Sequence, residues 1–307
     1  MVLKKITACA FIAGIMVASA STPAFSEELT GTLKKIKDTG VMTLGVRESS
    51  IPFSYMDSNQ TYQGYSIDIC NKITEAVKNR LGMQELEVKT LPITSSTRIP
   101  LTVNGTIDIT CGSDANNLER QKQVAFTMTT YVGHTAFVAK KADNIQTVDD
   151  LKGKTVVSTS GSTDVKLIAD LNKQRDLGMK IVVGPDHMNS FMMVDAGRAT
   201  AFVMTDILVA SLVASSKNPD DYSVRIIDSL PVEPWSLMLR RDDPQFKQLV
   251  DGVLVDAFKS GEMKDLYKKW FQSTLPSLNV NLNIPMSRRL EAAMASPTDS
   301  GDPADYQ

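Results

Sequence analysis

The run from Tyr131 to Lys140 reads YVGHTAFVAK, ten mostly apolar residues that predict a single extended strand. Such a strand is long enough to leave one β-sheet and enter another. Trp235 to Leu239 reads WSLML and predicts a second crossing strand. Two crossings imply that the chain leaves a first lobe, builds a second lobe and then returns. The sequence therefore predicts two lobes with a cleft between them, and a small ligand would bind in that cleft.

Helical and extended patterns alternate on both sides of the first crossing. The predicted strands lie at 41–46, 86–89, 107–109, 155–157, 181–183 and 201–204. The predicted helices lie at 31–37, 69–81, 99–101, 163–171, 191–196, 207–215, 246–258 and 263–271. This alternation is typical of mostly parallel sheets covered by helices, so we expect an α/β fold in each lobe.

The first segment has the pattern of a secretory signal peptide. Lys4 and Lys5 precede an apolar run from Ile6 to Ala20, and small residues follow before a cleavage site near Ser26. We therefore expect a signal peptide at 1–26, a first lobe formed by 27–137 and 236–287, and a second lobe at 138–235. Residues 288–307 are rich in Ser, Pro, Asp and Gly towards their end, and we expect a flexible tail there.

Composition excludes several classes of function. Lysine and arginine number 33 against 35 acidic residues, a balance that favours neither nucleic acid nor an anionic membrane as partner. The two histidines lie far apart and no cysteine pair has CxxC spacing, so we expect no metal and no cofactor. Cys70 and Cys111 remain after signal cleavage; they form either one disulfide or two buried thiols.

Seven segments together resemble the solute-binding proteins of polar amino-acid ABC importers, most closely the glutamate/aspartate-binding branch. They read GVRESSIPFSY (45–55), PITSSTRIPL (92–101), TCGS (110–113), NNLERQK (116–122), LKGK (151–154), TSGST (159–163) and MLRRDDPQFK (238–247). The resemblance implies a monomeric, two-lobed periplasmic protein. It would close on a small acidic ligand and then dock on a membrane permease.

An acidic amino acid brings two carboxylates, and burying them is costly unless each is paired. Arginine suits this task because its planar fork meets a carboxylate in two places. The resemblance implies that Arg120 grips the α-carboxylate, that Arg47 and Arg98 favour the distal carboxylate, and that Ser95 and Ser113 also contact the ligand. From composition alone, each arginine could equally lie solvated on the surface, and each serine could be a turn residue.

Two further features predict anion binding. Ser162 and Thr163 follow a strand and open a helix, where free backbone N–H groups attract anions; either side chain could also simply cap that helix. His187 matches a histidine that the glutamate/aspartate branch uses near the distal carboxylate, which would favour its charged form. The alternative for His187 is an exposed loop position.

Thr205 departs from the family pattern. The family places an aspartate at this strand end, where it pairs with the ligand's α-ammonium, and threonine brings no charge. The carboxylate could come from Asp206 by a register shift or from another acid such as Glu48, although adjacent strand residues face opposite ways. Alternatively, the ligand is a dicarboxylate without an amine.

The leading interpretation is a binding protein for glutamate or aspartate and not an enzyme. Periplasmic dehydratases share the two-lobed fold, but His187 is the only strong candidate for their general acid or base. A sensor that presents its loaded form to a receptor is a third class.

Overall fold

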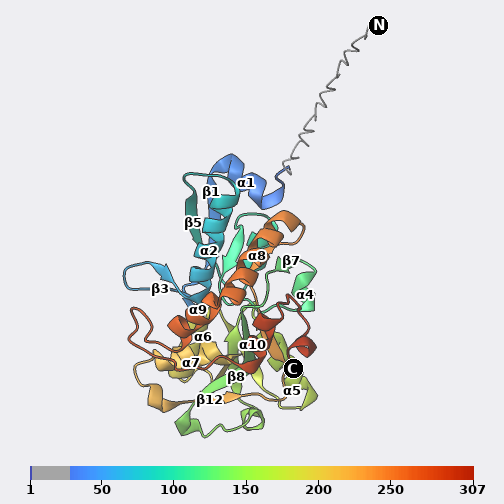
Figure 1. The fold of residues 1–307 in the computed structure, drawn as a ribbon. Coiled ribbons are helices and arrows are strands. Elements are labelled where there is room, and N and C mark those ends of the chain that lie inside the picture. The colour runs from blue at the N-terminus through green and yellow to red at the C-terminus, as the bar shows by residue number, and fades with distance from the viewer. Residues whose placement is uncertain (2–27) are drawn as a thin grey trace.

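The structure is a computed structural model that describes Met1 and residues 28–307, and the chain forms two lobes as predicted (Figure 1). The first and last parts of the chain, blue and orange in Figure 1, share the upper lobe. The middle of the chain, green to yellow, builds the lower lobe. The predicted signal peptide lies, apart from Met1, outside the described residues.

A five-stranded sheet in the order β5-β1-β6-β14-β7 forms the centre of the first lobe. β1 runs parallel to β5 and β6, whereas β14 is antiparallel to β6 and β7. β14 belongs to the returning chain, so both passages through this lobe are needed to complete its sheet. The strands are β1 (Val41–Val46), β5 (Glu87–Pro92), β6 (Ile109–Cys111), β7 (Val124–Phe126) and β14 (Met238–Arg240).

Helices cover this sheet because each has one apolar face. In α2, Ile69, Ile73 and Val77 recur at four-residue spacing, and all three are buried. A small separate sheet joins β2 (Ser49–Ser50), β3 (Ser54–Met56) and β4 (Tyr62–Gln63). The helices are α1 (Gly31–Thr39), α2 (Tyr65–Arg80), α3 (Arg98–Val103), α4 (Leu118–Gln121), α8 (Pro244–Ser260) and α9 (Glu262–Phe271).

The second lobe has its own sheet, in the order β10-β9-β11-β8-β12. β9 pairs in parallel with β10 and β11, and β8 pairs antiparallel with β11 and β12. The strands are β8 (Tyr131–Lys140), β9 (Thr155–Thr159), β10 (Lys180–Gly184), β11 (Ala201–Thr205) and β12 (Tyr222–Ile226). The helices are α5 (Thr163–Gln174), α6 (His187–Asp195), α7 (Asp206–Ala214) and the short η1 (Lys141–Asp143), η2 (Val148–Leu151) and η3 (Pro219–Asp221).

The chain passes between the lobes at two adjacent points. The backbone N–H groups of Thr127 and Thr130 donate to the carbonyls of Leu237 and Trp235, which fastens the two passages together. The first passage lies upstream of the expected boundary at residue 137, because residues 135–139 of β8 already pair with β11. The start of β8 pairs instead with β13 (Val232–Trp235).

The C-terminal segment is ordered, which corrects the expectation of a flexible tail at 288–307. It forms α10 (Arg288–Ala295) and the 3-10 helix η4 (Pro303–Tyr306). Leu290 and Met294, four residues apart, are buried in the main core, and Tyr306 packs on Val132 of β8. The Tyr306 hydroxyl lies 2.7 Å from Oγ1 of Thr129. A short apolar stripe therefore fixes this segment over the passage between the lobes despite its polar composition.

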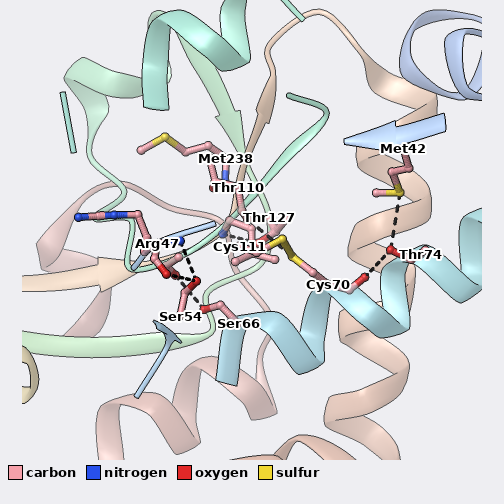
Figure 2. The surroundings of a disulfide bond; sticks show 12 residues. Met42, Arg47, Ser54, Ser66, Cys70, Thr74, Thr110, Cys111, Thr127 and Met238 are labelled. Carbon is pink, nitrogen blue, oxygen red and sulfur yellow. Dashed lines mark hydrogen bonds between the residues drawn. A yellow bond between two sulfur atoms is a disulfide. The ribbon is translucent and has the colours of Figure 1, made fainter. Parts of the chain in front are cut away.

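Cys70 of α2 and Cys111 of β6 form a disulfide with their Cα atoms 6.1 Å apart (Figure 2). Next to Cys111, the Thr110 hydroxyl accepts a 2.8 Å hydrogen bond from the backbone N–H of Met238 in β14. The bridge thus ties α2 to the strand that leads into the predicted site. Within the described part of the chain, no helix combines the length and the apolar character needed to cross a membrane.

Candidate functional site

Arg47 lies where β1 ends, and its guanidinium is buried between the lobes. Its backbone N–H donates to Oγ of Ser54 over 2.8 Å, which fixes the start of the loop (Figure 2). Its Nη2 contacts Oγ of Ser95 at 3.1 Å and Nε2 of His187 at 3.2 Å. Burial, and then the charge of Arg98, lower the pKa of Arg47 to about 10.

Arg98 opens α3 and is held by the loop that follows β6. Its Nη1 donates to the carbonyl of Ser113 at 2.9 Å and to Oδ1 of Asp114 at 2.5 Å. The other oxygen of Asp114 accepts a hydrogen bond from the Thr110 hydroxyl. Arg98 therefore has a buried carboxylate partner from its own lobe.

Arg120 lies in α4, whose first turn is capped by the Asn117 side chain. Its Nη1 donates to the carbonyl of Ala115 at 2.7 Å, and its Nη2 donates across to the carbonyl of Gly161 at 3.0 Å. Burial, followed by the charge of Arg98, lowers the pKa of Arg120 to about 9. Its side chain is thus aimed at the second lobe and not at solvent.

His187 is buried at the start of α6 and is not an exposed loop residue. Since Arg47 can only donate, Nε2 of His187 accepts from it, and Nδ1 therefore carries the proton towards Oγ1 of Thr159 at 2.9 Å. Burial, and then the charges of Arg47 and Arg98, lower the pKa of His187 well below its usual value. In this arrangement the neutral ring is favoured, the reverse of the expected charged form.

Ser162 and Thr163 stand at the start of α5, as predicted. Ser162 is the N-cap residue, but its side chain makes no capping hydrogen bond and instead lies 3.4 Å from Oγ of Ser158. Thr163 donates its hydroxyl proton to Oε1 of Glu233, a residue of β13. Neither side chain therefore caps the helix through its hydroxyl.

Thr205 ends β11 and also contacts Glu233. Its hydroxyl donates to Oε2 of Glu233 at 2.7 Å, so a buried carboxylate lies directly beside the position that lacks one. Asp206 turns away, with its Oδ2 3.6 Å from Nδ1 of His134. Glu48 is exposed. Asp206 and Glu48 are the two replacements for the missing aspartate that the sequence suggested. Among the described residues, neither forms a hydrogen bond with Thr205.

Asp164 directly follows Thr163 in α5 and is a second buried acid near Glu233. Within residues 28–307, neither of its carboxylate oxygens has a hydrogen-bond partner of good geometry, although the Thr135 hydroxyl lies beside it. Burial, and then the charge of Glu233, raise its pKa well above the ordinary value, and Arg120 partly opposes that shift. The neutral form of Asp164 is therefore favoured.

Two of the predicted arginines contact the second lobe, Arg47 through His187 and Arg120 through the carbonyl of Gly161. In the part of the chain that the structure describes, Nη1 of Arg47, Nε of Arg98 and Oγ of Ser113 are buried polar atoms without a partner. Neither Arg47 nor Arg120 has a described carboxylate within ion-pair distance. A cavity of about 470 Å³ between the lobes is lined by Glu233 and, of the nine predicted positions, by Thr163 alone. Such a surface suits an anionic ligand with two charged ends.

Sequence reasoning missed three acids of this surface: Asp114, Asp164 and Glu233. Two of them had a weak local signal, because Asp114 directly follows the TCGS segment and Asp164 lies in the first turn of α5, where anion binding was predicted. Glu233 lies two residues before Trp235, just upstream of the predicted crossing strand at 235–239. Its hydroxyl partners come from two other elements, so spacing alone could not connect them.

Comparison with known proteins gives a family and close relatives. A family model described as bacterial extracellular solute-binding proteins, family 3, matches residues 42–273. The L-glutamate/L-aspartate-binding protein of Pseudomonas aeruginosa is 46% identical over 93% of this chain and 94% of its own length. The glutamate/aspartate import solute-binding protein of Escherichia coli is 43% identical, over 96% of each chain.

A solved structure also shares the fold. It is an ancestral amino acid-binding protein described as a precursor of cyclohexadienyl dehydratase, with a TM-score of 0.67 and 26% identity over 79% of this chain and all of that one. The two-lobed architecture therefore occurs in amino acid-binding proteins from which an enzyme is derived.

Proposed function

We propose L-glutamate or L-aspartate as the ligand of this chain, which belongs to family 3 of the bacterial extracellular solute-binding proteins. One observation carries the proposal. Two buried guanidiniums, those of Arg47 and Arg120, face the interlobe surface without a carboxylate partner among residues 28–307. Burying a cation without a counter-charge is costly, so this surface is matched to a ligand that brings two carboxylates.

The two guanidiniums divide the ligand between them. Arg120, beside the first turn of α5, binds the α-carboxylate, because the helix end adds N–H donors and a favourable dipole. Arg47, Arg98 and Ser95 bind the distal carboxylate, using Nη1 of Arg47 and Nε of Arg98, which have no other described partner. His187 holds Arg47 in place at the same end by accepting from its Nη2.

Lobe closure follows from the same contacts. Arg47 and Arg120 belong to the first lobe, whereas His187 and Gly161 belong to the second, so a ligand held among them contacts both lobes. A ligand that binds both lobes favours the closed arrangement, and the paired passages of the chain serve as the hinge. Names that relatives carry, binding or import of glutamate and aspartate, are consistent with this ligand.

The protein acts as a carrier and not as an enzyme. Both nitrogens of His187, the general acid or base candidate named from the sequence, are engaged by neighbours. We infer export to the periplasm, a monomeric state and docking of the closed form on an ABC permease. Nuclear magnetic resonance of L-glutamate and L-aspartate incubated with the protein tests whether the protein is a carrier and not an enzyme. Any new product would contradict the carrier role.

Calorimetry with refolded, ligand-stripped protein tests the ligand. L-Glutamate and L-aspartate are expected to bind, and L-glutamine, which keeps the shape but loses the distal charge, should bind about 100-fold more weakly or worse because a buried guanidinium stays unpaired. Succinate completes the panel as an amine-free diacid. Equal affinity for L-glutamine and L-glutamate, or no heat with either acidic amino acid, would overturn the proposal.

A further inference from the structure

Thr205, which stands where the family has an aspartate, lies next to Glu233, an acidic residue from another element. Thr205 donates to Oε2 of Glu233 over 2.7 Å, and Thr163 donates to Oε1 of the same carboxylate. Glu233 is only 5% exposed and has no cationic side chain within ion-pair distance among the described residues. Hydroxyls orient a carboxylate but do not neutralise it, so Glu233 is a buried anion that lacks a counter-charge.

We propose that Glu233, oriented by Thr163 and Thr205, is the acceptor for the α-ammonium of the ligand. The inference rests on the proposed function and deepens it, because it selects an amino acid over an amine-free diacid. Glu233 accepts from Thr163, two residues after Gly161, whose carbonyl accepts from Arg120, so its carboxylate lies near the proposed α-carboxylate site. Thr205 then does not abolish ammonium recognition. Its hydroxyl orients the carboxylate of Glu233 in the hinge strand β13, and that carboxylate accepts the ammonium.

The charges of the surface agree with this assignment. Arg98 is neutralised by Asp114, and the raised pKa of Asp164 favours its uncharged form. Two guanidiniums, Arg47 and Arg120, and one carboxylate, Glu233, then remain without an ion-pair partner among the described residues. An acidic amino acid offers the complementary set of two carboxylates and one ammonium. A diacid without an amine would leave Glu233 buried and unpaired, facing a second anion.

The test compares L-glutamate with glutarate, the same diacid without its amine, by calorimetry. In the unaltered protein, L-glutamate should bind at least about 100-fold more tightly than glutarate, because glutarate leaves the buried Glu233 carboxylate without a cation. In Glu233→Gln this preference should fall to about 10-fold or less. Asp206→Asn is the matched control, since it removes a neighbouring carboxylate that contacts His134, and it should keep the full preference.

A double variant restores a carboxylate to the site at a different position. Thr205→Asp in the Glu233→Gln background places a carboxylate at the end of β11, and the preference for L-glutamate should recover by about 10-fold or more. If Glu233→Gln fails to fold, Thr205→Val takes its place, because it removes one hydroxyl that orients Glu233 and should lower the same preference.

The possible outcomes separate this inference from the proposed function. If the unaltered protein binds glutarate as tightly as L-glutamate, the ammonium is not recognised and the inference fails, although diacid binding stands. If it binds neither compound, the proposed function itself fails. If Glu233→Gln, or Thr205→Val in its place, leaves the preference unchanged by weakening both ligands equally, Glu233 is a structural residue and the inference is overturned.

Discussion

At the scale of single residues, the two unpaired guanidiniums make different predictions. Arg120→Ala should weaken every ligand of the class by about 100-fold or more, since it removes the partner of the α-carboxylate that all of them share. Arg47→Ala should weaken L-glutamate far more than L-glutamine, because only the former has a distal charge. Calorimetry with both compounds measures this, and exposed Arg175, which pairs with Asp149, supplies a control alanine variant. Losses of equal size for both ligands in Arg47→Ala would contradict the division.

His187 makes a prediction about pH. Its pKa in the folded protein lies well below the ordinary value of about 6.5, so below that pH the unfolded chain binds a proton that the folded chain does not. This residue therefore costs stability as the pH falls, up to about 2 kcal/mol between pH 7.5 and 5, at 1.36 kcal/mol per unit below the unfolded pKa. Urea unfolding of the unaltered protein and of His187→Gln at both pH values measures the difference. Identical pH dependence in the two proteins would show that His187 has the same pKa in the folded and the unfolded chain.

At the scale of elements, the regular segments were predictable because each carries its own signal. The strand predicted at 41–46 coincides with β1, and the stripe of Ile69, Ile73 and Val77 predicted α2. The C-terminal segment was not predictable in the same way, because Leu290 and Met294 are few apolar residues in a polar sequence and are buried only against a finished core. The passage between the lobes was misplaced because β8 is apolar along its whole length, so nothing local marks where its partner changes.

The same limit applies to the site. The arginines and serines could be predicted because they lie in segments that resemble a family, each next to a strand end. Glu233 could not, because its role depends on hydroxyls from α5 and β11 that meet it only after the lobes are assembled. Local sequence therefore predicted the residues proposed to bind the carboxylates, and the fold was needed to find the one proposed to bind the ammonium.

The disulfide between α2 and β6 makes a prediction about stability. It closes a loop with a sequence separation of 41 residues, and a crosslink of that span restricts the unfolded chain. Replacing Cys70 and Cys111 together by serine should lower the free energy of unfolding by about 2–4 kcal/mol. Urea unfolding with and without reductant measures this. The reduced natural protein should match the double variant, whose own stability should not respond to reductant; a response there, or no loss at all, would contradict the prediction.

At the scale of the whole molecule, the backbones of the two lobes approach each other closely at one point. Oγ of Ser96 in the first lobe lies 3.5 Å from the carbonyl of Ser160 in the second. Gly161, with a φ of +77°, sits against Ser96 so closely that a Cβ atom there would lie 2.6 Å from the Ser96 backbone. Backbone cannot move aside as a flexible side chain can, so this glycine permits full closure.

Gly161→Ala should therefore hold the lobes apart. L-Glutamate affinity should fall about 10- to 100-fold, as expected for overpacking of a tight contact, and X-ray scattering at saturating ligand should give a larger radius of gyration than for the unaltered protein. Gly153→Ala is the matched control: its φ of +71° imposes similar backbone strain, but its Cβ would meet nothing within 4 Å. Both variants should show the same loss of thermal stability without ligand, and only Gly161→Ala should bind poorly. If the two variants bind alike, or if Gly161→Ala reaches the compact form, Ser96 and Gly161 do not meet in the closed protein, and closure ends short of this contact.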